Sequence, residues 1–137
     1  MPVKIFLRFL AAMTLSAAFY ALVGALFMWY HGNDPRGWFI ALYLAGHFHG
    51  FWLYLVGLMV LLGVAPALNR GRGAWRYGLT GAGLGLVLPL LIFPDYLDSG
   101  PGIPFDFVAY LVSGAAFGVL AYYWIIKPGY RALGPPP

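Results

Sequence analysis

Hydrophobic residues fall into four long runs along the chain, at residues 3–30, 38–68, 75–93 and 105–126. Each run reaches or exceeds the ~20 residues that an α-helix needs to cross a bilayer. Segments rich in turn-forming residues separate them: HGNDPRG after the first run, NRGRG after the second and PDYLDSGPGIP after the third. The pattern predicts one all-α membrane domain over residues 1–137, built as a four-helix transmembrane bundle.

The two ends of this bundle follow from length and from proline chemistry. The first run is too long for the apolar core of a signal peptide, so we expect it to be retained as a helix. After Ile126 the chain reads KPGYRALGPPP. Because proline lacks an N–H and its ring clashes with the preceding turn, we expect the last helix to end near Ile126 and an irregular tail to follow.

Composition and charge add a location and an orientation. The chain is 62% hydrophobic and only 9% charged, against about 25% charged residues in soluble proteins. This excludes a soluble domain, a disordered chain and a nucleic-acid-binding module. All four acidic residues and Arg36 fall on one predicted side of the membrane, and the other cations fall on the opposite side: Lys4, Arg8, Arg70, Arg72, Arg76, Lys127 and Arg131. The positive-inside rule then predicts that both termini are cytoplasmic, in a prokaryotic inner membrane.

Small residues recur at four-residue spacing in every run. They are Ala17/Ala21/Ala25, Gly46/Gly50, Gly81/Gly85 and Gly114/Gly118. Lipid provides no hydrophobic force that drives helices together, so close packing of small side chains has to hold them. The repeats therefore predict helix–helix contacts, within this chain or with others.

Two histidines are the only ionisable residues deep inside the predicted spans. His47 lies ~14 Å and His49 ~17 Å below the outer interface at 1.5 Å per residue, near the middle of a hydrocarbon core about 30 Å thick. On a continuous helix they differ by about 200°, so they cannot share one metal ion. A neutral imidazole at this depth suits haem iron, or the magnesium of a chlorophyll-type pigment. The structural alternative is a pair of buried histidines hydrogen-bonded to neighbouring helices.

The stretch GHFH, Gly46 to His49, resembles the tenth helix of the catalytic subunit of the heme–copper oxidase superfamily. In that family an HFH tripeptide on a helix of the same direction ligates two haems on opposite faces. The resemblance, which covers one predicted helix of four, implies that His47 is the axial ligand of a high-spin haem and His49 that of a low-spin haem, with Phe48 between them. Gly46 and Gly50 would allow close approach of a flat group.

The chain departs from that family in its supply of ligands. The only further histidine is His31, in an outer loop, where we expect an interfacial residue. The three copper-ligating histidines and the second low-spin ligand of the oxidases have no counterpart. Oxygen reduction by this chain alone is therefore not expected, and a sixth ligand would come from a second copy or another subunit. No hydrolytic residue set is visible either, so no catalytic residue is predicted.

The sequence thus favours a membrane-embedded b-type haem-binding electron-transfer protein or subunit. Two alternatives remain open: a redox-silent or pigment-binding small subunit of a respiratory or photosynthetic membrane complex, and a small transporter. Asp95, Asp98 and Asp106 lie around the third loop. They offer oxygen ligands for a hard cation, but a solvated acidic loop is the simpler interpretation.

Overall fold

The structure is a computed structural model that describes residues 2–48, 50–68, 73–92 and 103–132. Nearly all of these residues are helical, in the order α1 (Pro2–Tyr30), α2 (Pro35–Phe48), α3 (Gly50–Leu68), α4 (Ala74–Ile92), α5 (Ile103–Ala121), the π-helical turn η3 (Tyr122–Ile126) and α6 (Lys127–Ala132). The predicted all-α class is confirmed.

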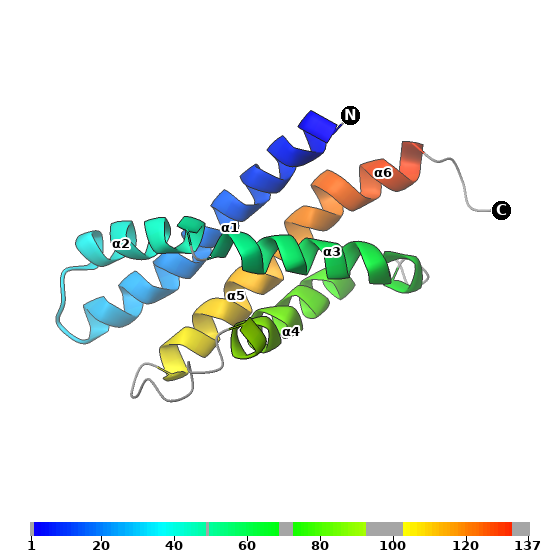
Figure 1. Ribbon diagram of the computed structural model, residues 1–137. Coiled ribbons are helices and arrows are strands. Elements are labelled where there is room, and N and C mark those ends of the chain that lie inside the picture. The colour runs from blue at the N-terminus through cyan, green and yellow to red at the C-terminus, as the bar shows by residue number, and fades with distance from the viewer. Residues whose placement is uncertain (1, 49, 69–72, 93–102, 133–137) are drawn as a thin grey trace.

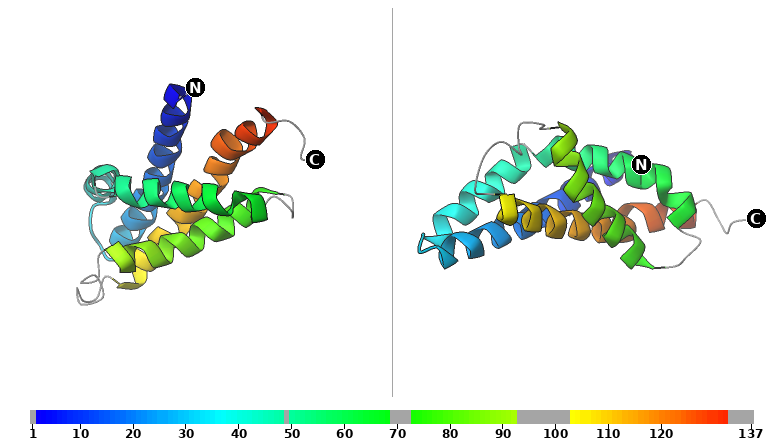
Figure 2. Two further views of the ribbon diagram at one scale, coloured as in Figure 1. Left: turned by 45° about the vertical axis from the view of Figure 1, so that its right-hand side comes forward. Right: turned by 90° about the horizontal axis from the view of Figure 1, so that it is seen from below.

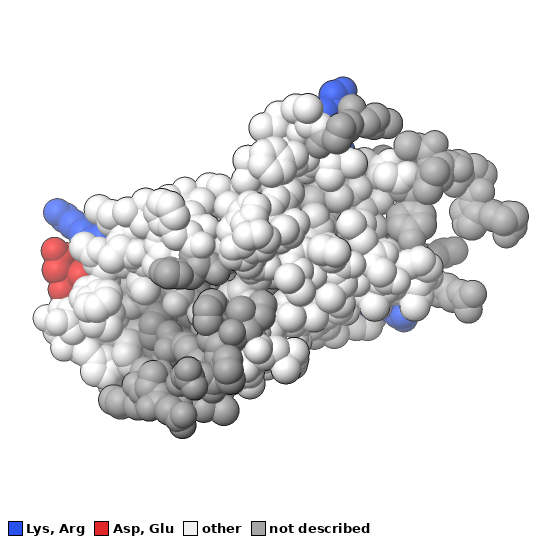
Figure 3. Space-filling model, viewed as in Figure 1, with Lys and Arg blue, Asp and Glu red and all other residues white. Residues whose placement is uncertain are grey.

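Three helical segments are long and apolar enough to cross a membrane within the described part of the chain. They are Val3–Tyr30, Gly50–Leu68 and Val108–Gly129. Helix α4 is as long as α3, at 19 residues, but it carries Arg76 and several glycines and is not among the three. On the visible face the charged side chains lie at the ends of the molecule, with an uncharged belt between them (Figure 3). These features identify an integral membrane protein.

The second predicted span is not one helix, and this corrects the sequence prediction. The run at 38–68 contains two helices, α2 and α3, which run in different directions (Figure 2). Helix α2 has 14 residues and a length of ~21 Å at 1.5 Å per residue, too short to cross the hydrocarbon core, whereas α3 has the length for it by itself. The rotation of about 200° between His47 and His49 stays a prediction, because His49 lies outside the described residues.

Different neighbours hold the two halves. Helix α2 returns along α1, while α3 crosses over to α4 (Figures 1 and 2). Helix α5 lies between α1 and α4 and packs against both. The glycines on either side of the break, Gly46 and Gly50, lower the cost of bending because glycine is a poor helix former.

The turn between α1 and α2 follows directly from its sequence. Gly32 has φ 84°, and Asn33 N donates to Met28 O at 2.9 Å, which closes a Schellman-type end of α1. Asp34 then accepts a hydrogen bond from Arg36 N at 3.1 Å and caps α2, with Pro35 in the first helical position. The turn predicted from HGNDPRG is confirmed.

The helix at the C-terminal end continues past Ile126, so the prediction that it stops there was wrong. The chain accommodates Pro128 through η3, where Lys127 N donates to Tyr122 O, five residues back. Pro128 has no N–H to offer the carbonyl of Trp124. Instead, Arg8 Nη1 donates to Trp124 O at 3.0 Å, which joins the start of α1 to the end of this long helix.

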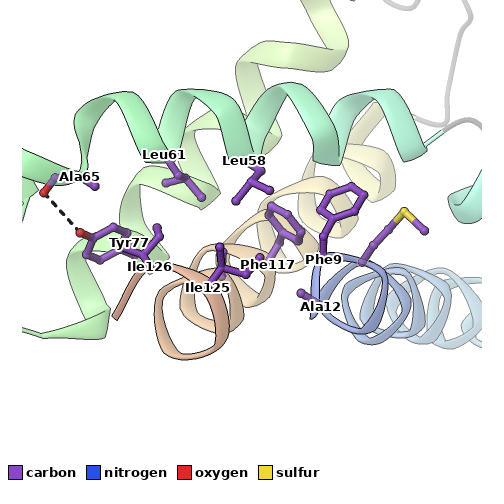
Figure 4. Packing of buried hydrophobic residues seen from close by; sticks show 11 residues of the cluster. Phe9, Ala12, Leu58, Leu61, Ala65, Tyr77, Phe117, Ile125 and Ile126 are labelled. Atoms are coloured by element: carbon purple, nitrogen blue, oxygen red, sulfur yellow. Dashed lines mark hydrogen bonds between the residues drawn. The ribbon is translucent and has the colours of Figure 1, made fainter. Parts of the chain in front are cut away.

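The core forms where α3 crosses α1, α4 and α5 (Figure 4). Leu58, Leu61 and Ala65 recur along one face of α3 and are buried. They meet the apolar side chains Phe9, Ala12, Tyr77, Phe117, Ile125 and Ile126. The contacts between these two groups of side chains add dispersion attraction. The hydroxyl group of Tyr77 also donates a hydrogen bond to Ala65 O at 3.4 Å.

The predicted contact of small residues is tightest between α4 and α5. A methyl group at Gly81 would overlap the carbonyl oxygen of Gly114, and one at Gly118 would overlap that of Tyr77. The backbones therefore touch directly, an approach that only glycine permits. On the other side of the molecule Gly46 lies against Ala17, since a Cβ at Gly46 would be 3.2 Å from Ala17 Cβ.

Candidate functional site: a cavity beside the broken helix

A cavity of about 260 Å³ lies beside the junction of α2 and α3. Its walls come from the middle turns of α1, α4 and α5, from the last turn of α2 and from the first two thirds of α3. Six glycines contribute to the lining: Gly46, Gly50, Gly57, Gly81, Gly85 and Gly114. The volume is close to the lower end of the roughly 300–1,000 Å³ of ligand sites.

Among the described residues, the cavity lining contains no charged side chain, and its polar side chains are all hydroxyl groups. They belong to Tyr20 of α1, Tyr54 of α3, and Tyr110 and Ser113 of α5. Ser113 Oγ donates to Tyr110 O at 3.3 Å. The rest of the wall is aliphatic, aromatic or glycine, so a neutral, mostly apolar molecule would match it.

Aromatic rings surround the hydroxyl groups. The rings of Tyr20 and Tyr110 lie 5.3 Å apart between centroids, and those of Tyr54 and Phe117 lie 5.0 Å apart. Both distances are within the usual range for aromatic pairs. Leu61 and Phe117 line the cavity and are also part of the hydrophobic core, so the cavity adjoins the packed region shown in Figure 4.

His47 faces α1 and does not line the cavity. Its Nδ1 lies 2.8 Å from Tyr43 O, one turn earlier in α2, and its Nε2 lies 3.1 Å from Thr14 Oγ1. A carbonyl can only accept, so Nδ1 carries the proton of the neutral ring and Nε2 accepts from the Thr14 hydroxyl. Both ring nitrogens thus have protein partners, as expected for a histidine that connects two membrane helices.

This geometry allows a direct test of whether a haem fits at His47. The proton position is suitable, because metal-ligating histidines donate their second ring N–H to a carbonyl or carboxylate. The space is not suitable, because Thr14 occupies the position of the metal and Gly46 is in close contact with Ala17. The described residues therefore do not fit a haem at His47.

The other predicted site residues divide between described and undescribed positions. His49 lies outside the described residues. Phe48 is 77% exposed and faces away from the rest of the described chain. Gly46 and Gly50 both line the cavity.

None of the described residues predicted to lie on the outer side of the membrane is part of the cavity lining. His31 is exposed in the turn after α1, where its Nδ1 donates to Phe27 O at 2.9 Å and its ring lies 4.4 Å from that of Phe27. Asp95 and Asp98 lie outside the described residues, and the side chain of Asp106 does too. Among the residues that are described, no three histidine or acidic side chains come together as metal ligands.

Sequence reasoning missed the hydroxyl groups of the cavity. Tyr110, Ser113, Gly114 and Phe117 follow the i, i+3, i+4, i+7 pattern of one helix face. Polar and small residues on one face of a membrane helix are a signal for its protein-facing side. The partners from α1 and α3 could not have been assigned, because they depend on where the second run breaks.

Comparisons with known proteins leave the site to be interpreted from its own geometry. No protein family, curated protein or solved structure matches the chain.

Proposed function

We propose that the protein is a membrane-embedded electron-transfer protein or subunit that holds a lipid-soluble redox cofactor in the cavity beside α3. The observation that carries this proposal is a cavity beside helices long and apolar enough to cross a membrane, whose described lining is uncharged and apolar except for a set of hydroxyl groups. The cofactor supplies the electron chemistry, and the chain supplies burial, orientation and exclusion of water. In this proposal α1, the joined α2–α3 segment, α4 and α5 make four passes, and both termini are cytoplasmic.

The experiment is cofactor retention by variants that fill the cavity or leave it unchanged. Gly57 is buried and lines the cavity, with Leu88 Cδ1 at 3.9 Å from an added Cβ, so Gly57→Leu would occupy the space. Gly63→Leu, on the same helix, adds the same group at an exposed position with no atom within 4 Å. Detergent-purified protein would be extracted with solvent and the extract examined for redox-active pigments and lipids.

We expect wild type and Gly63→Leu to retain a redox-active molecule in near-stoichiometric amount, and Gly57→Leu to lose it. Equal retention by all three proteins would show that the molecule is bound elsewhere. If wild type retains none, the proposed function is wrong.

Haem b is the cofactor that the sequence favours, and it remains a candidate through His49. The lining includes no described residue with an imidazole, and His47 is closed off by Thr14. A pyridine-haemochrome spectrum of wild type, His47→Ala and His49→Ala decides this candidate. A haem band that disappears only in His49→Ala would support it, and no band in any preparation would exclude it.

A second candidate function is a redox-silent or pigment-binding small subunit of a larger membrane complex. The hydrogen-bonded His47 favours it, because both ring nitrogens already serve helix packing. Co-purification with a large complex, with no pigment on the isolated chain, would support this candidate over the first.

A further inference from the structure

The chemistry of the cavity is specific enough to indicate a class of cofactor. We propose that the cavity binds the ring of a quinone-class molecule, with a ring oxygen at the hydroxyl groups of Tyr54 and Ser113 and the ring beside Gly57 of α3. This inference rests on the proposed function and identifies its ligand. It uses only residues that the structure describes.

Among the residues that the structure describes, the cavity lining has neither cationic nor anionic side chains. An ionised ligand would lose its hydration there without gaining a counter-charge, which is costly in a low dielectric. The ligand is therefore neutral, and it is soluble in lipid because α1, α3 and α5, which contribute to the cavity wall, are long and apolar enough to cross a membrane.

Two hydroxyl groups from different helices line the cavity, that of Tyr54 on α3 and that of Ser113 on α5. Ser113 Oγ donates to Tyr110 O at 3.3 Å, a long hydrogen bond that rotation of the hydroxyl can exchange for one to a ligand. A hydroxyl group both donates and accepts, so these two groups can donate to a quinone carbonyl and accept from the O–H of the reduced quinol. A plain hydrocarbon would use neither capacity, and a bulky polar lipid headgroup would demand more partners than this wall offers.

The shape of the lining also suits a planar ring. Gly57 of α3 leaves open space, because an added Cβ would have only Leu88 Cδ1 within 4 Å, at 3.9 Å. Tyr54 and Phe117 line the same cavity with their ring centroids 5.0 Å apart. A bound ring can pack against them in the offset or edge-on geometry that aromatic groups prefer.

The test compares two ligands that differ only in their oxygens. Menadione is a methylated naphthoquinone, and 2-methylnaphthalene has the same carbon skeleton without carbonyl groups. Binding of each to detergent-solubilised full-length protein, stripped of bound lipid, would be measured by equilibrium dialysis. Tyr54→Phe and Ser113→Ala remove one hydroxyl each, and Leu62→Ala serves as a control at an exposed position of α3.

We expect wild type to bind menadione at least about tenfold more tightly than 2-methylnaphthalene. Tyr54→Phe and Ser113→Ala should each weaken the binding of menadione by about three- to tenfold, the usual effect of one hydrogen bond. Neither substitution should change the affinity for 2-methylnaphthalene. Leu62→Ala should change neither affinity.

The possible failures are distinguishable. Equal binding of both ligands by wild type would overturn the quinone assignment while leaving an apolar cofactor site intact. Binding of neither would overturn the quinone assignment and weigh against the proposed function. A preference for menadione that survives both substitutions would place the quinone away from this hydroxyl pair, contrary to the inference. The wild-type comparison stands even if a variant fails to fold.

Discussion

The seam between α4 and α5 and the broken second span show two ways of packing helices in lipid. Along the seam, Gly81 and Gly85 of α4 face Gly114 and Gly118 of α5, and the backbones touch. Along the second span, α2 follows α1 while α3 departs to cross α4 and α5. The seam is continuous, whereas the broken span leaves a cavity at its bend.

The difference lies in what each contact requires. In the seam, a Cβ added at one of these glycines would overlap a backbone atom of the opposite helix, and the backbone cannot change rotamer to avoid it. In the broken span the closest contacts involve side chains, such as Gly46 against Ala17 and His47 with Thr14. Side chains can adopt other rotamers, so this region tolerates change and can adjust to a ligand. We infer that the glycine contacts of the seam hold the molecule together, and that the proposed site lies where the broken span meets the seam.

The sharpest way to break the seam is to add a side chain within it. Gly81→Leu would force α4 and α5 apart because its Cβ would overlap the carbonyl of Gly114. We expect a loss of at least about 3 kcal/mol in the free energy of unfolding, the upper range for overpacking. Thermal unfolding in detergent, followed by circular dichroism, would measure it.

Gly83 is the control for this experiment. It lies two residues along the same helix, is exposed, and has no atom within 4 Å of an added Cβ. Gly83→Leu should leave the melting temperature nearly unchanged. Similar losses at both positions would mean that the seam is not the tighter of the two regions.

A second experiment tests how firmly α3 is held after it leaves α2. Leu61 is fully buried where α3 meets the core, while its neighbour Leu62 is 47% exposed. Leu61→Ala should cost about 2–4 kcal/mol through lost packing and an added void next to the cavity. Leu62→Ala should stay within about 0.5 kcal/mol. Equal effects would indicate that α3 is oriented differently.

The hydrogen bond between α1 and α2 should contribute less to the free energy of unfolding than the α4–α5 seam or the burial of Leu61. His47→Ala and Thr14→Val each remove one partner of the hydrogen bond at 3.1 Å. Such bonds in membrane proteins contribute about 0.6 kcal/mol on average and about 1.7 at most. A double-mutant cycle on thermal stability should give a coupling in that range.

The same pair distinguishes a structural His47 from a haem ligand. In the structural role, the two substitutions lower stability by similar amounts, and neither changes an absorption spectrum. In the ligand role, His47→Ala removes a haem band while Thr14→Val preserves it. A coupling near zero would contradict the structural role.

Much of the fold could be predicted because it depends on local pattern. Run lengths and loop composition gave the helices, and the spacing of Gly81/Gly85 and Gly114/Gly118 gave the seam. The change of direction between α2 and α3 could not be predicted in this way. The hydrophobic run is continuous in sequence, whereas the packing partners of the two helices differ: α2 packs against α1, and α3 packs against α4 and α5.

Only the part of the candidate site that depends on local sequence pattern could be predicted. Gly46 and Gly50 were singled out as cofactor-binding positions, and both line the cavity, while cofactor binding by them stays a prediction. The interest in His47 came from its depth, but depth does not reveal a partner, and Thr14 lies 33 residues away in sequence. Tyr54 and Ser113 line the same cavity only because α3 packs against α5, so no local pattern identifies them as a pair.

The smallest expected effect lies at the end of the molecule, where neither way of packing applies. Pro128 leaves Trp124 O without its usual helical donor, and Arg8 supplies one at 3.0 Å. Arg8→Met should cost about 0.5–1 kcal/mol, since the bond is exposed. In a Pro128→Ala background the restored N–H can satisfy the same carbonyl, so the cost of Arg8→Met should fall toward zero. The cycle is measured by thermal unfolding, and an unchanged cost in that background would show that Arg8 stabilises the end by its charge instead of by this hydrogen bond.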